Sequence, residues 1–264
     1  RRKMKGGDLL KKRNELKKNY RSDGDIVPFC SEILSGGPWT MNHNNSESLT
    51  HKYTNDISYN FTKSSGETDE QLELLVKELM DTGYVPYCYD KNNPKSFQII
   101  TYTNKDCVAY SKIVRNLYND NISDNKYEKG DPIIIKKNDS SKDIHNGDEG
   151  IILDFVDYYD YRILYTNSEN EKVEIILNDC EIKPALARTV HSSQGSQFPI
   201  VIYVGKSDFL NLNINYTAYS RAKSKLYLIG LIDCFNGENA REKSEERNTF
   251  ISLNYMELNC PEPE

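Results

Sequence analysis

The stretch from Ala187 to Val204, ARTVHSSQGSQFPIVIYV, constrains the fold more than any other part of this chain. It begins with polar side chains typical of a loop and passes through Gly195, where backbone can approach a ligand closely. It ends in a bounded apolar run from Pro199 to Val204, which is typical of a strand buried on both faces. We therefore predict an α/β protein whose polar loop presents ligand-binding groups at the edge of a sheet.

The following segment repeats this pattern. Residues 216–223, YTAYSRAK, predict a helix that carries Arg221, and the apolar run at 225–230 predicts the next buried strand. Upstream, apolar residues spaced three and four apart predict a helix over 26–34. Residues 39–66 are rich in Asn, Ser and Thr, and we expect a long loop there with one short strand.

Two more helices and a strand are expected before residue 126. Thr68-Asp-Glu-Gln71 predicts a capping box that opens a helix with Leu72, Leu75, Val76 and Leu79 on its buried face. Residues 97–102 predict a strand, and Thr103 predicts the cap of the next helix. The buried stripe expected on that helix is Cys107, Tyr110, Val114 and Leu117.

The pattern changes at about Lys126. Four short strands are expected at 130–137, 146–155, 161–166 and 172–177, with a tight turn at Asn146-Gly147. Such a run of short strands indicates a small β-barrel inserted into the α/β domain. We expect the α/β pattern to resume at Ile182 and to run to about Ile232.

The motifs resemble a known family. TVHSSQGSQF and YTAYSRAKSKLYLIG resemble motifs V and VI of superfamily 1 helicases, closest to the RecD-like branch, which generally moves 5′→3′ on single-stranded DNA. GDPIIIKKND and HNGDEGIILDF resemble the SH3-like insert of that branch. The resemblance implies a RecA-like parallel sheet flanked by helices, with an inserted SH3-like β-barrel. The expected segments are a basic N-terminal segment at 1–19, the RecA-like domain at 20–125 and 182–235, the insert at 126–181 and an acidic tail at 236–264.

The resemblance also implies roles for two arginines. Arg221 matches the arginine finger of motif VI, which stabilises charge developing on the γ-phosphate. The alternative is a structural arginine paired with a carboxylate. Arg21, in Asn19-Tyr-Arg-Ser, resembles the Tyr-Arg element of motif IV, and its alternative is one more member of the basic N-terminal run.

Nucleic-acid and nucleotide contacts are implied in the same way. Thr189, His191 and the adjacent Ser192 fall where motif V meets the DNA backbone; Thr103 and Asn104 resemble the strand end that does so, while also fitting a helix cap. His191 can instead be a loop histidine that holds the turn. Gln194 and Gly195 match positions that couple nucleotide to DNA, whereas Gln197 replaces the usual Glu. Lys136, Lys137 and Lys142 on the insert could touch the displaced strand or be solvated, and we expect them to be solvated.

The chain lacks the motifs of a complete ATPase. No GxxxxGK[ST] is present, and Gly205-Lys206-Ser207 follows the wrong residues to form a phosphate loop. Neither Asp69-Glu70 nor Asp148-Glu149 follows an apolar strand, so neither resembles a Walker B pair. ATP and Mg²⁺ would be held mainly by an N-terminal RecA-like domain bearing Walker A and B, and this chain alone should be inactive. Because no strand precedes the basic start, the chain is expected to be the later part of something larger.

Composition limits the partners. The net charge is −6 and the pI about 5.4, so nucleic-acid contact must come from a local patch. One patch is residues 1–21, with ten Lys/Arg against two acidic residues, hence 10 − 2 = +8. Six scattered Cys without CxxC indicate a reducing intracellular compartment, cytoplasmic or nucleoid-associated, rather than disulfides or zinc, and no metal site is predicted. The apolar runs are too short to span a bilayer, so no membrane partner is expected.

The expected function is the C-terminal motor half of an ATP-dependent DNA helicase. It would supply the arginine finger and single-stranded DNA contacts to a composite ATP site. Two alternatives remain open: a non-catalytic nucleic-acid-binding module, and a protein-interaction scaffold in which the insert docks a partner.

Overall fold

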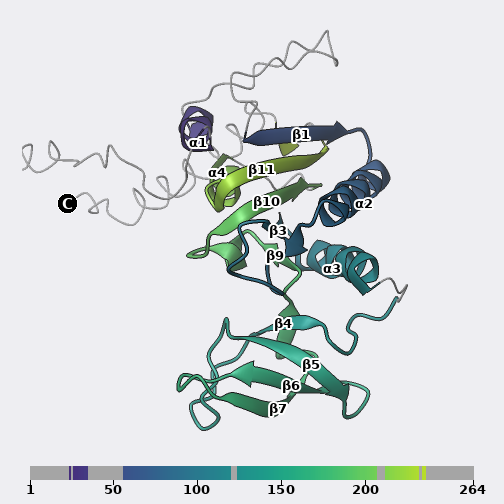
Figure 1. Ribbon diagram of the computed structural model, residues 1–264, viewed down its shortest axis with the longest axis vertical. Coiled ribbons are helices and arrows are strands. Elements are labelled where there is room, and N and C mark those ends of the chain that lie inside the picture. Colours follow the sequence, from purple (N-terminus) through teal and green to yellow (C-terminus); the bar gives the residue numbers. More distant parts are fainter. Residues whose placement is uncertain are drawn as a thin grey trace, which may run out of the picture.

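Two sheets, one parallel and one antiparallel, lie one above the other along the long axis of the molecule (Figure 1). The computed structural model describes residues 24, 26–34, 56–119, 124–206, 212–231 and 234–235. The predicted α/β class, a parallel sheet with helices plus a separate antiparallel insert, is confirmed.

The upper sheet is parallel throughout and has the order β1-β11-β10-β3-β2, with β9 also paired to β3. Strand β10 (Phe198–Gly205) lies at its centre and is buried over nearly its whole length, as its apolar run predicts. The other strands are β1 (Ile57–Thr62), β2 (Val85–Pro86), β3 (Ser96–Thr101), β9 (Ala187–Thr189) and β11 (Ala222–Leu231).

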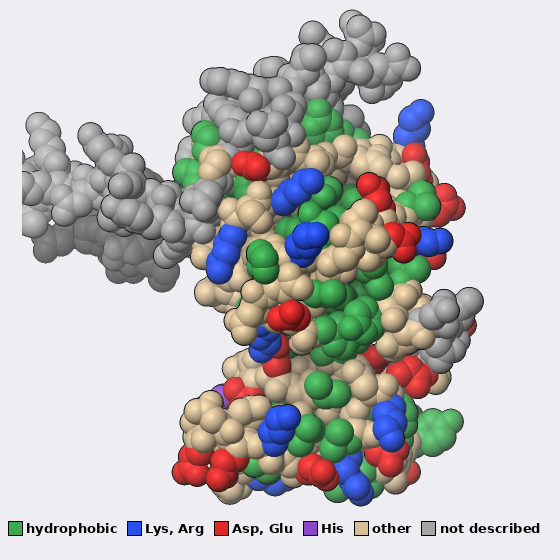
Figure 2. Space-filling model, in the orientation of Figure 1, with side chains coloured by type: hydrophobic (Ala, Val, Ile, Leu, Met, Phe, Trp, Pro, Cys, Tyr) green, Lys and Arg blue, Asp and Glu red, His purple; other side chains and the backbone are tan. Residues whose placement is uncertain are grey.

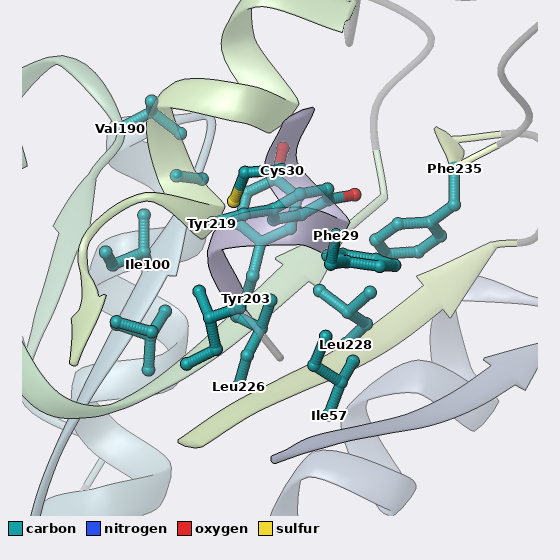
Figure 3. Close-up of a cluster of buried hydrophobic side chains, with 14 of the residues drawn as sticks. Phe29, Cys30, Ile57, Ile100, Val190, Tyr203, Tyr219, Leu226, Leu228 and Phe235 are labelled. Carbon is teal, nitrogen blue, oxygen red and sulfur yellow. The ribbon is translucent and has the colours of Figure 1, made fainter. Parts of the chain in front are cut away.

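Helices cover both faces of this sheet (Figure 1). One face packs against α2 (Ser65–Asp81) and α3 (Asn104–Asn119), and the other against α1 (Ile26–Leu34) and α4 (Leu212–Tyr219). The predicted buried positions Leu72, Val76, Leu79, Cys107, Tyr110 and Val114 form the first layer. In the second layer, Phe29 and Cys30 of α1 meet Tyr219 of α4 above Tyr203 of β10 (Figure 3).

Helix α2 begins one turn earlier than the sequence predicts. Ser64, rather than Thr68, is the N-cap, because its hydroxyl accepts a hydrogen bond from the Glu67 backbone N–H at 3.2 Å. The Glu67 carboxylate in turn accepts the Lys63 N–H at 2.8 Å. Thr68 is buried inside the first turns, where its hydroxyl lies 2.6 Å from that of Thr62 on β1. The prediction failed because two consecutive Ser/Thr-x-x-Glu/Gln strings, 64–67 and 68–71, compete as helix starts and only the burial of Thr68 distinguishes them.

The lower sheet is antiparallel, with the order β7-β6-β5-β4-β8 and its own hydrophobic core. The four predicted strands are present, and Asn146 and Gly147 form the predicted turn, with Gly147 at φ +108°. Residues 182–184, expected in the α/β part, instead pair with β4 and complete this sheet. The strands are β4 (Pro132–Ile135), β5 (Glu149–Phe155), β6 (Asp160–Thr166), β7 (Lys172–Asn178) and β8 (Ile182–Pro184).

Two arginine–carboxylate pairs join the insert to the parallel-sheet domain. Arg115 of α3 and Asp131, before β4, are both buried and lie 2.9 Å apart (Arg115 Nη1 to Asp131 Oδ2). Arg188 of β9 pairs with Glu149 of β5, which also pairs with Lys91 at 2.9 Å. Burial favours a raised pKa at Glu149, but Arg188 and Lys91 outweigh it and hold the pKa of this carboxyl below its usual value.

Several predicted features lie outside the described residues. These are Arg21, the basic segment at 1–19 and the acidic tail at 236–264. Within the described ranges, no helix combines the length and the apolar character needed to cross a bilayer. None of the five described cysteines forms a disulfide bond.

We predict that Arg115→Met destabilises the protein by about 3–5 kcal/mol at about pH 7, because it leaves Asp131 buried without its cation. Burial already raises the pKa of Asp131 against the opposing effect of Arg115, so its ionisation works against folding. The penalty should shrink as the pH falls from about 7, because the raised pKa lets the folded state bind a proton at Asp131 before the unfolded chain does. Urea unfolding at a series of pH values measures this.

Arg162→Met is the matched control, because Arg162 is exposed on β6. It should change the free energy of unfolding by no more than about 0.5 kcal/mol. Equal destabilisation by the two substitutions would contradict a structural role for the buried pair.

Candidate nucleic-acid and nucleotide interface

The parallel pairing of β3 with β9 brings two polar segments together at their carboxyl ends. Thr101 pairs with Thr189 in this ladder, so Thr103 and the loop from Thr189 onward leave the sheet side by side. Ligand-binding groups in open α/β sheets gather at this edge. Residues 86 positions apart in sequence thus share one site.

Thr103 caps α3 as predicted. Its hydroxyl accepts the Asp106 N–H at 3.1 Å and lies 2.6 Å from the Asp106 carboxylate. Asn104 is the first helical residue and is exposed. The cap fixes both side chains at the helix N-terminus, where unpaired backbone N–H groups favour anions.

Thr189 and Ser192 hold the loop after β9. The Thr189 hydroxyl accepts the Ser192 N–H at 3.1 Å, and the Ser192 hydroxyl donates to the Thr189 carbonyl at 3.1 Å. These bonds stabilise the short 3₁₀ helix η1 (His191–Ser193). The His191 side chain is exposed. Within the described part of the chain, the hydrogen bonds of His191 are made by its backbone and not by its imidazole. The turn is therefore held by the hydroxyls and the backbone, and the imidazole faces outward.

A groove of about 940 Å³ lies between the parallel-sheet domain and the insert. All five residues that the motifs connect with nucleic acid line it, namely Thr103, Asn104, Thr189, His191 and Ser192. Four cationic side chains also line it, Lys126, Lys136, Lys183 and Arg188, against one carboxylate, Asp179, hence 4 − 1 = +3 with His neutral. On the face shown in Figure 2, basic and acidic side chains are interspersed. The groove is thus a local concentration of positive charge on an acidic chain.

Arg221 lies in the turn between α4 and β11, not on the helix as predicted. Helix α4 ends at Tyr219, and the Arg221 N–H closes the turn on the Ala218 carbonyl at 3.1 Å. The Phe198 N–H donates to the Arg221 carbonyl at 2.9 Å, which ties this turn to the start of β10. The pairing of β10 with β11 therefore ends the helix earlier than its sequence pattern indicates.

The Arg221 guanidinium is held at the motif V loop. It donates to the carbonyls of Thr217 and Ser196 at 3.0 and 3.1 Å and to the Ser220 hydroxyl at 3.0 Å. It also lies near Cys30, whose pKa burial raises to about 12 while Arg221 opposes the shift. The contact with Ser196 places Arg221 beside the predicted nucleotide-coupling residues, which are Gln194, Gly195 and Gln197.

Gly195 is exposed and has φ +86°, a conformation that favours glycine, and a Cβ there would meet nothing within 4 Å. The backbone is therefore accessible to a ligand at this point. The residues of the strings that do not form a phosphate loop or a Walker B pair make ion pairs instead. Lys206 pairs with Asp69, and Glu149 pairs with Arg188. No group of His, Cys, Asp or Glu in the described chain is arranged to hold a metal ion.

The sequence patterns did not identify Lys183 and Arg188 as site residues. Lys183 is half-buried between the buried residues Ile182 and Pro184 along β8, and all three residues line the groove. The alternation is visible in the sequence, but its meaning depends on β8 joining the insert.

The chain matches a helicase family over part of its length. Residues 184–229 match the family of UvrD-like helicase C-terminal domains. The ATP-dependent RecD2 DNA helicase of Deinococcus radiodurans is 28% identical over 139 residues, which cover 49% of this chain and 18% of that protein. Protein MJ1519 of Methanocaldococcus jannaschii is 30% identical over 123 residues, 44% of this chain and 9% of that one. The chain thus spans less than a fifth of the length of these relatives.

Among solved structures, the Pif1 helicase from Bacteroides in complex with ADP-AlF3 and ssDNA is similar with a TM-score of 0.47 and 17% identity. The similarity covers 81% of this chain and 51% of that one. The family match contains both the motif V loop and Arg221, and the sequence relationship to RecD2 extends it. Residues 184–229 therefore match the UvrD-like helicase C-terminal domain, and the chain is homologous to the RecD2 DNA helicase over 49% of its length.

Proposed function

We propose that this chain is the C-terminal motor half of an ATP-dependent DNA helicase, which grips single-stranded DNA and completes a composite ATP site. One observation carries the proposal: five motif residues from two distant segments meet in one groove with a net positive lining. Hydroxyl, amide and imidazole groups bind phosphate and sugar without reading bases. A motor that moves along any sequence requires such contacts.

The nucleotide half of the proposal rests on Arg221. Its guanidinium lies half-buried at the Ser196 carbonyl, within the loop that also carries His191 into the groove. A nucleotide bound between this domain and its partner would supply the phosphoryl-transfer chemistry. Arg221 would stabilise charge on the transferring phosphate, and its loop would couple that event to the strand in the groove.

The described residues fit one edge of a nucleotide site rather than a whole one. Gly195 offers accessible backbone and Arg221 offers a guanidinium, whereas the described chain contains no phosphate-cradling loop. The partner domain bearing Walker A and B would hold the β-phosphate and Mg²⁺. Arg21, Gln194 and Gln197 would add contacts from this side. The intact helicase, made of this chain and its partner domain, would act where DNA and ATP are available, in the cytoplasm or at the nucleoid.

We predict that Arg221→Ala in the longest natural polypeptide containing this region lowers kcat for DNA-stimulated ATP hydrolysis by about 10³-fold or more. Oligonucleotide affinity without nucleotide should stay within a few fold. Arg162→Ala, on the exposed face of β6, should leave both unchanged. Steady-state hydrolysis and fluorescence anisotropy measure the two quantities.

Because Arg221 also holds its own turn, a second variant separates chemistry from folding. Arg221→Lys keeps a cation but loses the planar fork, so hydrolysis should fall while thermal stability stays near that of the natural protein. If a folded Arg221→Lys or Arg221→Ala protein hydrolyses ATP normally, the arginine-finger role is wrong. The chain would then be a binding module with a helicase fold.

We further predict that Thr189→Val weakens binding of a single-stranded oligonucleotide about 5-fold, the cost of one neutral hydrogen bond. Thr189→Ser should restore it, because the hydroxyl that binds Ser192 is retained. Thr166→Val, on the exposed end of β6, is the control and should have no effect. A loss that is the same for several base sequences supports backbone contact, whereas no loss at all contradicts placement of DNA in this groove.

A further inference from the structure

We propose that strand β7 forms an interface with a second copy of this chain, in which the two β7 strands pair antiparallel across a two-fold axis. This inference does not rest on the proposed function. None of the described residues that line the nucleic-acid groove belongs to β7. The pairing would therefore join two copies without using the groove of either.

Strand β7 is the outer edge of the insert sheet, at the end of the molecule opposite the parallel sheet (Figure 1). Within the described part of the chain, it pairs with β6 alone. It has seven residues, contains no proline and pairs with β6 without a register shift. The opposite edge, β8, has only three residues and ends at Pro184. Short length and proline protect an edge strand from further pairing, and β7 has neither.

The β6–β7 ladder is flanked by one backbone hydrogen bond at each end. The Asp179 N–H donates to the Tyr159 carbonyl, and the Asn167 N–H donates to the Glu171 carbonyl, each at 2.9 Å. Hydrogen-bonded pairs recur at every second position of an antiparallel ladder. The odd-numbered residues of β7 therefore bond to β6.

The even-numbered residues Lys172, Glu174 and Ile176 consequently turn their backbone N–H and C=O groups away from β6. In the described chain, none of these backbone groups has a hydrogen-bond partner. The N–H of Asn178, the next even-numbered residue, donates to the Glu181 carboxylate at 3.0 Å. An added strand would supply partners for the groups at 172, 174 and 176.

A cavity of about 510 Å³ follows this edge. It is lined by the consecutive β7 residues 173–176, together with Lys142 and Arg162. Because successive strand residues point to opposite faces, a cavity lined by all of them runs along the edge rather than over one face. Ile176 is 50% exposed and offers apolar surface to a partner at this edge.

The sequence of β7, KVEIILN, favours one register of pairing with itself. Outward backbone groups must face one another, so even-numbered residues pair with even-numbered residues. A two-fold axis through Glu174 would place this carboxylate opposite its copy, which is destabilising. An axis through Val173 would use only the start of the strand, because the preceding turn residue Asn170 has φ +63°. An axis through Ile175 pairs the whole strand, 172–178.

The register centred on Ile175 is free of like-charge contacts. It places Glu174 opposite Ile176 of the second copy and Lys172 opposite Asn178 of the second copy. Ile175 faces Ile175 of the second copy, so apolar side chains meet at the axis. The edge is therefore self-complementary, as an isologous interface requires, and this identifies a second copy as its occupant.

The test measures self-association of the longest natural polypeptide containing this region, by sedimentation velocity over a range of protein concentrations without DNA. The natural protein should show a monomer–dimer equilibrium. Ile176→Glu creates two like-charge contacts with Glu174 in each dimer and should raise the dimer dissociation constant by about tenfold or more. Leu74→Glu is the matched control, because Leu74 is an exposed apolar residue on α2, and it should leave the constant unchanged.

A rescue variant separates the register from a general effect of charge. Combining Glu174→Lys with Ile176→Glu sets opposite charges against each other across an axis at Ile175, so the dissociation constant should return to near that of the natural protein. An axis through Val173 would instead bring the new ammonium group opposite Lys172, and the double variant would not dimerise. Thermal unfolding checks that each variant is folded, which is expected because Glu174 and Ile176 are exposed.

Disulfide formation gives a second readout of the register. Glu174→Cys and Ile176→Cys are made separately, each with Cys180→Ser to remove an exposed native thiol. A hydrogen-bonded antiparallel pair has Cα atoms about 5.5 Å apart, within the range of a disulfide. Mild oxidation of the mixed proteins should therefore link them faster than it links either protein to itself. Faster linking within the Glu174→Cys protein alone would overturn the register centred on Ile175.

Two results would overturn the interface itself. One is a natural protein that stays monomeric at the highest concentration at which it is soluble. The other is a dimer that folded Ile176→Glu protein still forms with the natural dissociation constant, because its interface must then lie elsewhere. Oligonucleotide affinity of Ile176→Glu should stay within a few fold of the natural value, so failure of this proposal is distinct from failure of the nucleic-acid groove.

Discussion

The buried pair between Arg115 and Asp131 is the interaction on which the two-part architecture depends. The chain leaves α3 into the insert beside this pair and returns through β9, where Arg188 meets Glu149. At each of these two connections between the domain and the insert, an arginine is therefore held in position by its carboxylate partner. Such pairs add little net stability compared with an apolar contact. Removing one member of a pair, however, leaves the other as a buried charge without its counter-ion. Their effect is to fix orientation, and the groove is the space that this orientation leaves.

The groove obtains its chemistry from strand register. Because β3 and β9 are parallel and in register at Thr101 and Thr189, the polar residues after each strand emerge together. The Thr103 hydroxyl caps α3 and the Thr189 hydroxyl accepts the Ser192 N–H within η1, and both residues also line the groove. The structural and functional interpretations of Thr103 and Thr189 are thus compatible. Arg221 reaches the same loop from the turn before β11, through the Ser196 carbonyl.

Local pattern was enough to predict the central strands of the parallel sheet, the buried faces of α2 and α3, four of the five strands of the insert and the Thr103 cap. The errors all involve tertiary competition. Ser64 displaced Thr68 as a cap because Thr68 is buried against β1, and pairing of β10 with β11 ended α4 before Arg221. Residues 182–184 joined the insert because β4 offered an edge. Lys183 was missed for that reason, since its direction depends on which sheet it joins. The five motif residues connected with nucleic acid lie in one groove, whereas their roles remain predictions.

The strand order of the parallel sheet also determines the order in which its strands can pair during folding. In the sheet, β1 pairs with β11 alone, and its register joins Ile57 to Leu226 and Thr62 to Leu231. The insert, by contrast, is built from neighbouring hairpins whose contacts are local in sequence. Closing a long loop costs entropy before any contact compensates it, so distant pairings form late. During synthesis the insert can assemble while β1 still lacks its partner. The face where β10 meets β11 can be completed only after the whole insert has been made, because β11 follows the insert in the chain.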